Sequence, residues 1–592
     1  MDNISFIINQ LAEEREQYFN AVAPPIIQTS NFTFKDFKSL RETFEDEFSG
    51  EYIYTKSFMK KQHIPFRDTG RFSSLICDYL SENNTLKPFY GLFPTLNNFK
   101  TQITDKTKSY SVTHRKVLVQ SLREQYEIIT PSSLVLENLD LLAQKNTFTI
   151  TTGHQLSLMT GPLYFLYKII STINLCEQLK VKYPSSNFVP VYWMASEDHD
   201  FEEISSFRFQ DKRINWHRDS AGAVGEIPLD DLQEVLDVFE QYIGTSENSN
   251  TIRKWITESY RASHNLSEAT FRLVNELFGD KGLIILEPNK PALKKLFIPI
   301  LKAELTSQHS FKNVNSQLEN IQKTYSTSFI PQVNPREINL FYLAKNNRYR
   351  IEKEAGEFSL NGTEERFSEA SFLKILEIHP EYFSPNVILR PVYQEVILPN
   401  LCYIGGGGEI AYWFQLKKHF DFLKIPFPVL LLRNSAVIYS KKTAKKIKNL
   451  DLDVSDFFLK RNIIINKKIR EVSDIDLDLS FLKTQLNKQF DYLNKLVAKT
   501  DKSFEGAVTA QNIKQLKGIS NLEKRLLKAQ KKVFEDKVNR LVDIHDQLFP
   551  DDTLQERTIN FVSLYLKIGD AFLPTLFEAL DPMNPNFVLL EY

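Results

Sequence analysis

The 592-residue chain contains only three cysteines, and they are widely separated, with no CxxC pair among them. This scarcity argues against a disulfide framework and against a zinc cage of thiolates. The chain also lacks any apolar run long enough to cross a membrane, and Met1 opens an acidic, amphipathic stretch without the apolar core of a signal peptide. We therefore expect a cytoplasmic protein with no membrane partner.

The chain also has no excess of positive or negative side chains. The sequence has 73 basic and 74 acidic side chains, a formal net charge of −1. This balance argues against binding nucleic acid or an anionic membrane surface through charge alone. At this length a single core is exceeded, so several domains are expected.

The most informative segment is residues 147–204, which predicts strand, turn, helix and strand. Residues 147–152 are β-branched or aromatic, Pro162 suits the first turn of a helix, and residues 189–195 form a nearly continuous apolar run. Such units are parallel and right-handed, and open parallel sheets bind ligands at the carboxyl edge of their strands. The turn at 153–155 should therefore lie beside the segment 197–200.

Four ionisable residues, Glu197, Asp198, His199 and Asp200, follow the second strand and form the strongest site signal. Three acids beside an imidazole repel one another unless a cation or ligand offsets them. Because side chains alternate in extended chain, Glu197 and His199 should share one direction and the two aspartates the other. A helix N-cap would explain one aspartate only. Mg²⁺ held by Asp198 or Asp200 with a nucleotide is an open alternative, and zinc on His154, His199 and Asp200 is a weaker one.

The first turn, Gly153-His154-Gln155, precedes a helix whose N-terminus favours anions. We expect His154 and Gln155 to act with the acidic segment and to contact phosphate. Lys168, inside that helix, is either a ligand-binding residue or solvated. The candidate binding residues of this unit are Gly153, Gly161, Lys168 and Trp193.

A second unit of the same design follows, with a strand predicted over 396–404, a second turn at the glycine run 405–408, one helix from Glu409 to about Leu423 and a strand over 428–439. Four glycines allow close approach to a ligand or a nest of N–H groups, although a flexible turn is the plainer alternative. The run lacks the Lys-Ser/Thr of a P-loop. Arg390 and Arg433 are candidate forks for carboxylates. The binding candidates here are Arg390, Glu395, Gly405, Gly406, Gly407, Glu409, Arg433 and Asn434.

Two further features of this half favour structural roles. Cys402 lies in an apolar strand and is expected to be part of the core rather than a nucleophile. The basic segment 440–443 could contact phosphate, but a solvated turn is the favoured interpretation.

The expected fold class is α/β, with a Rossmann-like parallel sheet resembling class I nucleotidyl transferases, connective insertions and an antiparallel coiled coil. Leucine-rich 3-4 spacing between 479 and 548, with a turn near Gly506, predicts that coiled coil, and its apolar surface predicts self-association. The predicted units are helices and the first half of the core (1–204), an insertion (205–280), core (281–335), a second insertion (336–385), core (386–450), coiled coil (455–550) and a returning segment (551–592).

Several long strings carry a resemblance to a known family. The TGHQ turn resembles the HIGH motif of class I aminoacyl-tRNA synthetases, and TTGHQLSLMTGPLYFLYK, VPVYWMASEDHDFEEI, QVNPREINLFYL, LRPVYQEVILPNLCYIGGGGEIAYW and FPVLLLRNS together resemble the bacillithiol biosynthesis cysteine-adding enzymes. The similarity spans nearly the whole chain. Relatives often carry Gln where this chain has His154, and no clear KMSKS motif is present.

The resemblance implies a ligase that joins cysteine to the amine of glucosaminyl malate, giving bacillithiol. It also implies a homodimer through the coiled coil and ATP, with or without Mg²⁺, to activate the carboxylate as an adenylate or acyl phosphate. On this hypothesis His199 or Asp200 takes a proton from the amine and Arg390 or Arg433 receives the malyl carboxylates. The alternatives are another amide-forming or nucleotidyl-transferring ligase of this fold, or a coiled-coil interaction protein with a degenerate core.

Overall fold

The computed structural model describes residues 60–220, 222–327 and 329–592. The helices predicted before residue 60 lie outside these residues. Residues 60–145 are mostly helical, but this segment begins with a strand that was not predicted. The elements are β1 (Lys60–Pro65), α3 (Ser74–Leu80), a 3₁₀ helix (Asn84–Phe89), α4 (Phe99–Ser109), α5 (Val112–Tyr126) and α6 (Ser133–Leu142).

The predicted parallel sheet is confirmed. Its described strands run in the order β13-β12-β2-β3-β6, and every neighbouring pair is parallel. Every residue of β2 is buried, and β3 is buried from its second residue onward, because helices cover both faces. The bounds are β2 (Thr147–His154), β3 (Asn187–Met194), β6 (Ile284–Leu286), β12 (Asn400–Gly405) and β13 (Val429–Leu432).

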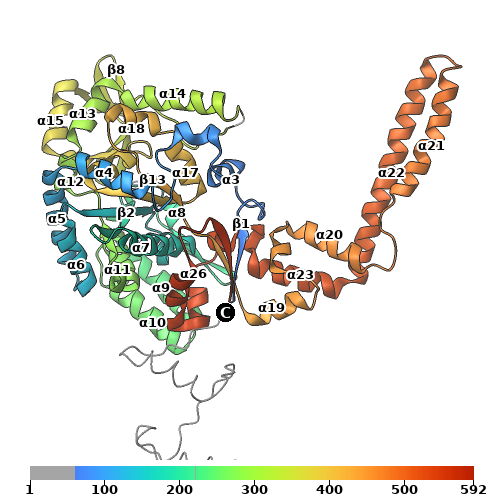
Figure 1. The fold of residues 1–592 in the computed structure, drawn as a ribbon, viewed down its shortest axis with the longest axis horizontal. Coiled ribbons are helices and arrows are strands. Elements are labelled where there is room, and N and C mark those ends of the chain that lie inside the picture. Colours follow the sequence, from blue (N-terminus) through green and yellow to red (C-terminus); the bar gives the residue numbers. More distant parts are fainter. Residues whose placement is uncertain (1–59, 221, 328) are drawn as a thin grey trace, which may run out of the picture. The chain divides into compact units, whose positions relative to one another are not determined.

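The helix α7 (Tyr164–Lys182) connects β2 to β3 and packs on both strands (Figure 1). It begins two residues after Pro162, and Leu163 at its N-cap donates its N–H to the carbonyl of Ile559. The helix therefore starts later than predicted, because residues 155–163 form a loop with a short 3₁₀ turn. Strand β2 also runs on through His154, so the turn begins at Gln155.

After β12 the chain forms two helices where one was predicted, α17 (Gly407–Phe414) and α18 (Lys417–Leu423). The predicted strand 428–439 is also divided. β13 ends at Leu432, and β14 (Ala436–Tyr439) belongs to a different sheet, of order β1-β15-β14. The last strand, β15 (Asn586–Glu591), pairs with both β1 and β14, so the C-terminal segment returns to the body as predicted.

Both predicted insertions contain short antiparallel strands. The first has a hairpin followed by helices, and the second a sheet of order β10-β9-β8-β7-β11. The bounds are α8 (Phe201–Ile204), β4 (Ser206–Phe209), β5 (Lys212–Asn215), α9 (Gln233–Tyr242), α10 (Glu247–Ile256), α11 (Leu266–Phe278), α12 (Pro291–Lys295), α13 (Ile298–Ser307), α14 (His309–Thr324), β7 (Leu340–Ala344), β8 (Asn347–Glu354), β9 (Glu357–Leu360), β10 (Arg366–Ser368), α15 (Glu369–Ile378), β11 (Phe383–Pro385) and α16 (Arg390–Ile397).

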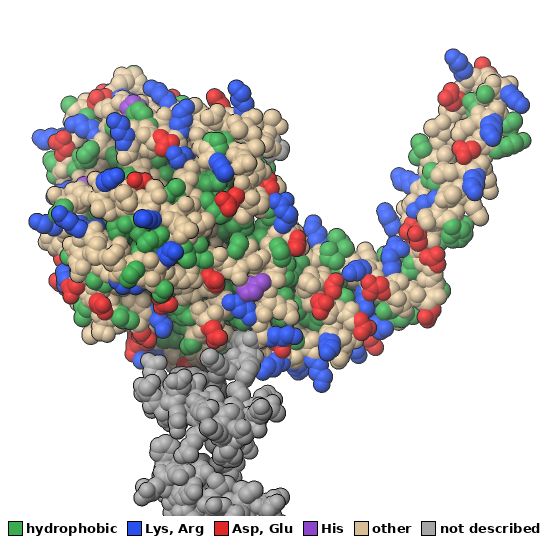
Figure 2. All heavy atoms as spheres, viewed as in Figure 1, with side chains coloured by type: hydrophobic (Ala, Val, Ile, Leu, Met, Phe, Trp, Pro, Cys, Tyr) green, Lys and Arg blue, Asp and Glu red, His purple; other side chains and the backbone are tan. Residues whose placement is uncertain are grey.

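The predicted helical hairpin is formed by α21 (Ser480–Val497) and α22 (Ser503–Val533), which lie side by side (Figure 1). Its turn is at 498–502, and Gly506 is inside α22. Apolar side chains stay exposed along it, including Tyr492, Ile513 and Leu522 (Figure 2). Self-association through this surface remains a prediction. The other C-terminal helices are α19 (Lys441–Lys448), α20 (Arg461–Val472), α23 (Glu535–Leu548), α24 (Gln555–Thr558), α25 (Val562–Ile568) and α26 (Phe572–Ala579).

Two structural expectations can be checked directly. Cys402 is fully buried in an apolar cluster beside Phe148 and Leu175, as expected for a core residue. Burial also raises the pKa of its thiol well above the usual value. Among the described residues, no helix combines the length and apolar character needed to cross a bilayer.

Candidate functional site

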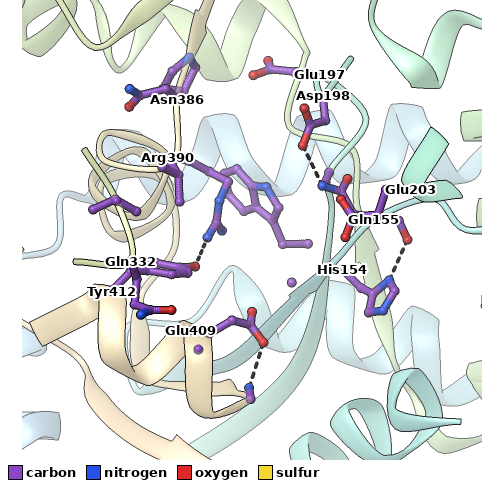
Figure 3. A pocket seen from close by; sticks show the side chains of 18 of the residues that line it. His154, Gln155, Glu197, Asp198, Glu203, Gln332, Asn386, Arg390, Glu409 and Tyr412 are labelled. Atoms are coloured by element: carbon purple, nitrogen blue, oxygen red, sulfur yellow. Dashed lines mark hydrogen bonds between the residues drawn. The ribbon is translucent and has the colours of Figure 1, made fainter. Parts of the chain in front are cut away.

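A cavity of about 810 Å³ lies where β2, β3 and β12 end (Figure 3). Loops and helices from the N-terminal half, the second insertion and the C-terminal segment complete its wall. The lining residues are Gly153, His154, Gln155, Tyr164, Lys168, Trp193, Met194, Ala195, Glu197, Asp198, Glu203, Pro288, Gln332, Val333, Asn334, Arg336, Phe341, Arg348, Pro385, Asn386, Val387, Arg390, Tyr403, Gly406, Gly407, Gly408, Glu409, Tyr412, Arg433 and Arg557.

The two polar segments that follow β2 and β3 meet at this cavity, as predicted from the parallel topology. Gln155 Nε2 donates to Asp198 Oδ2 over 2.6 Å. The other oxygen, Oδ1, accepts from the backbone N–H of His199 at 2.7 Å and lies 3.5 Å from Arg348 Nη1. Burial alone would raise the pKa of Asp198, but the His199 side chain, whose Nδ1 lies 3.3 Å from Oδ1, together with Arg348, Gln155 and the His199 N–H, outweighs burial and holds the pKa well below the usual value. Asp198 is therefore a fixed negative charge.

His154 is held as a neutral imidazole. Its Nδ1 lies 2.8 Å from the carbonyl oxygen of Gln155, so Nδ1 carries the hydrogen. Burial, reinforced by the positive charge of Lys168, lowers the pKa of His154 to about 3. Its ring contacts those of Tyr164 and Phe165, with centroids 5.2 Å and 4.9 Å away. The remaining nitrogen, Nε2, is consequently a hydrogen-bond acceptor.

Glu409 joins the second turn to the first. Its Oε1 accepts from the hydroxyl of Tyr403 at 2.6 Å, and its Oε2 accepts from the backbone N–H of Gly406 at 2.7 Å. Lys168 Nζ lies 2.6 Å from the same Oε2 and donates to the carbonyl of Gly153 at 2.7 Å. Lys168 is buried and paired rather than solvated. Burial lowers its pKa, while for Glu409 the nearby ammonium outweighs burial and lowers the pKa.

Two glycines of the run, Gly405 and Gly407, are tightly packed. A Cβ atom on Gly405 would lie 2.9 Å from the Cβ of Glu409, and one on Gly407 would lie 3.1 Å from Ile76 Cγ1. Gly406 is the N-cap of α17, so the N–H groups of the first helical turn are directed out of the helix at the cavity wall. Such groups suit a phosphate or carboxylate.

Both predicted arginines line the cavity. Arg390, at the first position of α16, donates from Nη2 to the hydroxyl of Tyr412 at 2.5 Å. Arg433 donates to Glu556 Oε1 at 2.7 Å and to the Asn434 carbonyl at 2.8 Å, and its buried Nε has no hydrogen-bond partner among the described residues. Arg433 is therefore partly committed to holding the chain where it passes from one sheet to the other.

The side chains of residues 197–200 do not alternate in direction as predicted. Glu197 and Asp198 line the cavity, whereas His199 and Asp200 do not, because the segment turns instead of continuing as a strand. Glu197 is ion-paired with the buried Lys294 and accepts from Ser384 at 3.1 Å. Asp200 accepts from the N–H of Glu203 and caps the short helix α8. Asp200 is therefore the one aspartate of this segment that serves as a helix N-cap.

Four other predicted binding residues lie outside the lining and have structural partners. Glu395 pairs with the buried Lys106 at 2.8 Å. Asn434 donates to the carbonyl of Asp581, and the carbonyl of Gly161 accepts from Asn560. Gly405 contributes through its close packing. The segment 440–443 also lies outside, where Ser440 caps α19.

Several cavity-lining residues were not predicted from the sequence. Arg348, in β8, stacks 4.0 Å from the ring centroid of Phe341 and donates to Ser384 at 3.1 Å. Nothing in its local sequence distinguished it from other insertion residues. Gln332, Asn334 and Arg336 lie in the string QVNPREINLFYL, which had been noted only for its resemblance. Tyr164, Glu203, Asn386, Tyr403, Tyr412 and Arg557 were also missed.

No group of three or more His, Cys, Asp or Glu side chains with metal-binding geometry is present among the described residues. The zinc alternative on His154, His199 and Asp200 therefore has no support. Carboxylates near a bound nucleotide can still take Mg²⁺ through its phosphates.

Comparisons with known proteins agree with this architecture. Residues 59–434 match the family model "Bacillithiol biosynthesis BshC, N-terminal Rossmann-like domain", and residues 436–592 match "Bacillithiol biosynthesis BshC, C-terminal coiled-coil domain". The chain belongs to the BshC family. The family resemblance and the Rossmann-like fold with a C-terminal coiled coil are thus confirmed. The boundary between the two BshC matches falls where the chain leaves β13 for β14.

Relatives from several organisms are named "Putative cysteine ligase BshC". The protein of Flavobacterium johnsoniae is 49% identical and that of Flavobacterium psychrophilum 49%, each over 89% of this chain and 99% of the relative. The protein of Cytophaga hutchinsonii is 34% identical over 90% of this chain and 99% of the relative. A chain titled as a putative arginyl-tRNA synthetase from Campylobacter jejuni has a TM-score of only 0.18 at 11% identity, which carries no argument.

Both BshC domains contribute to the cavity. Every lining residue lies within the Rossmann-like match except Arg557, which belongs to the coiled-coil match. Its neighbour Glu556 holds Arg433 in place. The C-terminal domain therefore supplies part of the site in addition to the helical hairpin.

Proposed function

We propose that this protein is an ATP-dependent cysteine ligase that joins the carboxylate of cysteine to the amine of glucosaminyl malate, giving bacillithiol. The proposal is supported by relatives named as putative cysteine ligases that are up to 49% identical over most of the chain. It also draws on the chemistry of the cavity. Cysteine, the glucosaminyl amine and the malyl carboxylates are small and charged, and the cavity is lined by charged groups of both signs.

The observation that carries the proposal is the separation of charge within one cavity. Arg390 and Arg433, with the N–H groups of the first turn of α17, supply donors and positive charge on one side, where the ammonium of Lys168 neutralises the Glu409 carboxylate. Asp198 and Glu203 supply negative charge on the other. Figure 3 shows Arg390 and Glu409 on one side, and Asp198, Gln155 and Glu203 opposite. Two reacting molecules, one bearing phosphates or carboxylates and one an amine, can meet between these walls.

A carboxylate resists attack by an amine, so ATP is the expected source of a better leaving group. The donor wall fits phosphate oxygens, since oriented N–H groups, arginine and lysine are the usual phosphate ligands. Arg390 and Arg433 in this wall also suit the malyl carboxylates. We assign the phosphate site to this wall rather than to His154 and Gln155, whose donors are already used within the protein.

The attacking amine must lose a proton, and we propose Glu203 as the base. Surrounding protein raises the pKa of Glu203, and the negative charges of Asp198 and Asp200 raise it further. A carboxylate with a raised pKa is a more effective base than Asp198, whose pKa is lowered. His199 and Asp200, the bases expected from sequence, lie outside the cavity lining.

The test is direct synthesis. Purified protein incubated with ATP, L-cysteine and glucosaminyl malate should form bacillithiol, measured by mass spectrometry. Glu203→Gln should lower the rate about 100-fold, the usual size of a general-base contribution. Glu202→Gln is the matched control, because Glu202 is the adjacent glutamate, is exposed as Glu203 is, and lies outside the cavity lining. If the wild-type protein forms no product, the proposed reaction is wrong. If the two variants have equal rates, the assignment of Glu203 as the base is wrong.

A cellular test uses thiol profiling. A deletion strain should accumulate glucosaminyl malate and lack bacillithiol, and the wild-type gene should restore it. Accumulation of a different amine would instead identify another acceptor and reject the stated substrate.

A further inference from the structure

Arg348, in β8, connects the second insertion to the acidic residues of the cavity. Its Nη1 lies 3.5 Å from Asp198 Oδ1 and 3.1 Å from His199 Nδ1, and its Nη2 donates to Ser384 Oγ at 3.1 Å. The hydroxyl of Ser384 in turn donates to Glu197 Oε2 at 3.1 Å. Directly or through one hydroxyl, this guanidinium therefore contacts both cavity-lining carboxylates that follow β3.

The Arg348 side chain is itself held in one position. It is 7% exposed, and its guanidinium lies 4.0 Å from the ring centroid of Phe341 in the neighbouring strand β7. Its two Nη groups reach acceptors in different elements, Asp198 after β3 and Ser384 in β11. A planar fork of donors suits two such acceptors, whereas a lysine ammonium is a single point charge. The sheet of the second insertion thus fixes the contact to Asp198.

The segment after β3 is not part of a strand, so other elements must position it. The carbonyl oxygen of Asp198 accepts from the N–H of Val224, in the first insertion, at 2.7 Å. Glu197 is paired with the fully buried Lys294. Among the described residues, Arg348 is the only arginine or lysine paired with the Asp198 carboxylate. Its contact therefore decides where that carboxylate lies.

The position of Asp198 matters because it acts on the proposed base. Burial raises the pKa of Glu203, and Asp198 is the charged group that raises it most. The interaction between two charges depends on their separation. Gln155 holds one oxygen of Asp198, and Arg348 lies beside the other. Removing Arg348 frees the second oxygen, so the carboxylate can move relative to Glu203.

We propose that Arg348 is a positioning residue, which fixes the Asp198 carboxylate beside Glu203 and so joins the second insertion to the reacting groups. The identity of the reaction rests on the proposed function, whereas the positioning rests on the contacts above. Because Arg348 acts through Asp198, it should affect the chemical step. Binding of ATP, whose phosphates are assigned to the opposite wall, should not depend on it.

The first experiment is the steady-state kinetics of Arg348→Gln with ATP, cysteine and glucosaminyl malate. The kcat should fall at least about tenfold, because small displacements of reacting groups are costly, while KM for ATP stays unchanged. Arg350→Gln is the matched control. Arg350 lies two positions along β8, is 3.9 Å from Glu352 and is outside the cavity lining, so both constants should remain those of the wild type.

Two rescue measurements separate positioning from a general structural role. Arg348→Lys keeps the charge but cannot serve Asp198 and Ser384 together, so it should recover part of the lost kcat. Arg348→Ala leaves space beside the cavity, and added guanidinium chloride, below the concentration that unfolds the protein, should raise its kcat about tenfold, the equivalent of one charged hydrogen bond. Circular dichroism confirms folding. If Arg348→Gln does not fold, Arg348→Lys provides the kinetic comparison.

A cycle of double variants tests the contact without turnover. Urea unfolding of the wild type, Arg348→Gln, Asp198→Asn and the double variant gives four unfolding equilibrium constants. The change in the double variant should differ from the product of the two single changes by about threefold or more, since charged residues in contact are energetically coupled. The same cycle with Arg350→Gln should show independent effects.

An Arg348→Gln variant with the wild-type kcat would overturn the proposal. Equal losses of kcat in Arg348→Gln and Arg350→Gln would also overturn it, because they would show a general effect on the insertion. If the wild-type protein makes no bacillithiol, the proposed function fails, and the unfolding cycle then decides about positioning. Coupling between Arg348 and Asp198 supports it, and independent effects overturn it.

Discussion

Gln155 and Asp198 are joined by a 2.6 Å hydrogen bond although 43 positions separate them in sequence. The contact exists because β2 and β3 are adjacent and parallel, in a register that pairs His154 with Met194. Both strands therefore release their polar segments at one edge of the sheet. This bond orients the Gln155 amide and keeps the Asp198 carboxylate at the cavity wall.

Gln155→Glu should reduce ligase activity at least tenfold. The change replaces a donor by a second carboxylate, so the two negative charges repel each other, and the Asp198 side chain moves or binds a proton. The steady-state rate with cysteine and glucosaminyl malate measures the effect. Gln178→Glu is the matched control, because Gln178 also donates to an aspartate, Asp581, at 2.9 Å but outside the cavity. Equal losses in both variants would show that general instability, not the site, is responsible.

Lys168→Met should destabilise the fold by about 3 kcal/mol, the lower end of the range for breaking a buried ion pair, because Glu409 retains 24% side-chain exposure. The variant leaves Glu409 without its cation and the Gly153 carbonyl without a donor. Urea unfolding followed by circular dichroism measures the change.

The double variant Lys168→Met/Glu409→Gln should recover part of that stability, because no unpaired charge remains, while activity stays low. Recovery of full activity would mean that the pair serves the fold only. Equal stability of the single and double variants would show that the two residues are not energetically coupled.

The low pKa of His154, about 3, makes stability depend on pH. Because this pKa lies below that of the unfolded chain, the unfolded state binds an extra proton as pH falls through about 6.5. The contribution of the neutral His154 to the free energy of unfolding is complete above that pH and is lost progressively toward pH 3. Between pH 7 and pH 5 the wild-type protein should lose about 2 kcal/mol more than His154→Gln.

Urea unfolding of both proteins at the two pH values checks this difference. His379→Gln, at an exposed histidine, should behave as the wild type does. A His154→Gln variant with the same pH dependence as the wild type would contradict the burial of a neutral imidazole.

Gly153→Ala should lower activity without a comparable loss of stability. The new Cβ would lie 3.3 Å from the Tyr403 hydroxyl, which must shift slightly, and 3.5 Å from Arg390 Nη1, which it would only contact. Gly518→Ala in α22 meets nothing within 4 Å and should instead stabilise the helix by about 0.5–1 kcal/mol. Activity assays and thermal unfolding separate the two effects. Unchanged activity in Gly153→Ala would mean that the reacting groups do not depend on this wall.

The parts of this structure that follow a strong periodic pattern were predictable. The alternation in β2, the apolar run of β3 and the glycine run before α17 placed these strand ends to within two residues, and parallel topology brought the ends together. The helical hairpin followed from its 3-4 spacing, although the turn is at 498–502 rather than at Gly506. The turn was misplaced because a single glycine is tolerated inside a long packed helix.

The errors arise where tertiary contacts decide. Residues 428–439 were predicted as one strand although Arg433, Asn434 and Ser435 interrupt the apolar run. The chain changes sheets at these three residues because Glu556, far along the sequence, accepts hydrogen bonds from Arg433 and Ala436. Likewise, Glu395 looked like a ligand-binding residue until its buried partner Lys106 was visible. Local sequence cannot identify partners that the fold supplies from a distance.

The most direct test of the account is a crystal structure of the protein with L-cysteine and glucosaminyl malate bound together. The account predicts both molecules in the 810 Å³ cavity, with the amine of glucosaminyl malate toward Glu203 and its malyl carboxylates toward Arg390 or Arg433. Ligands bound elsewhere on the molecule, with the space between His154 and Glu409 empty, would contradict it.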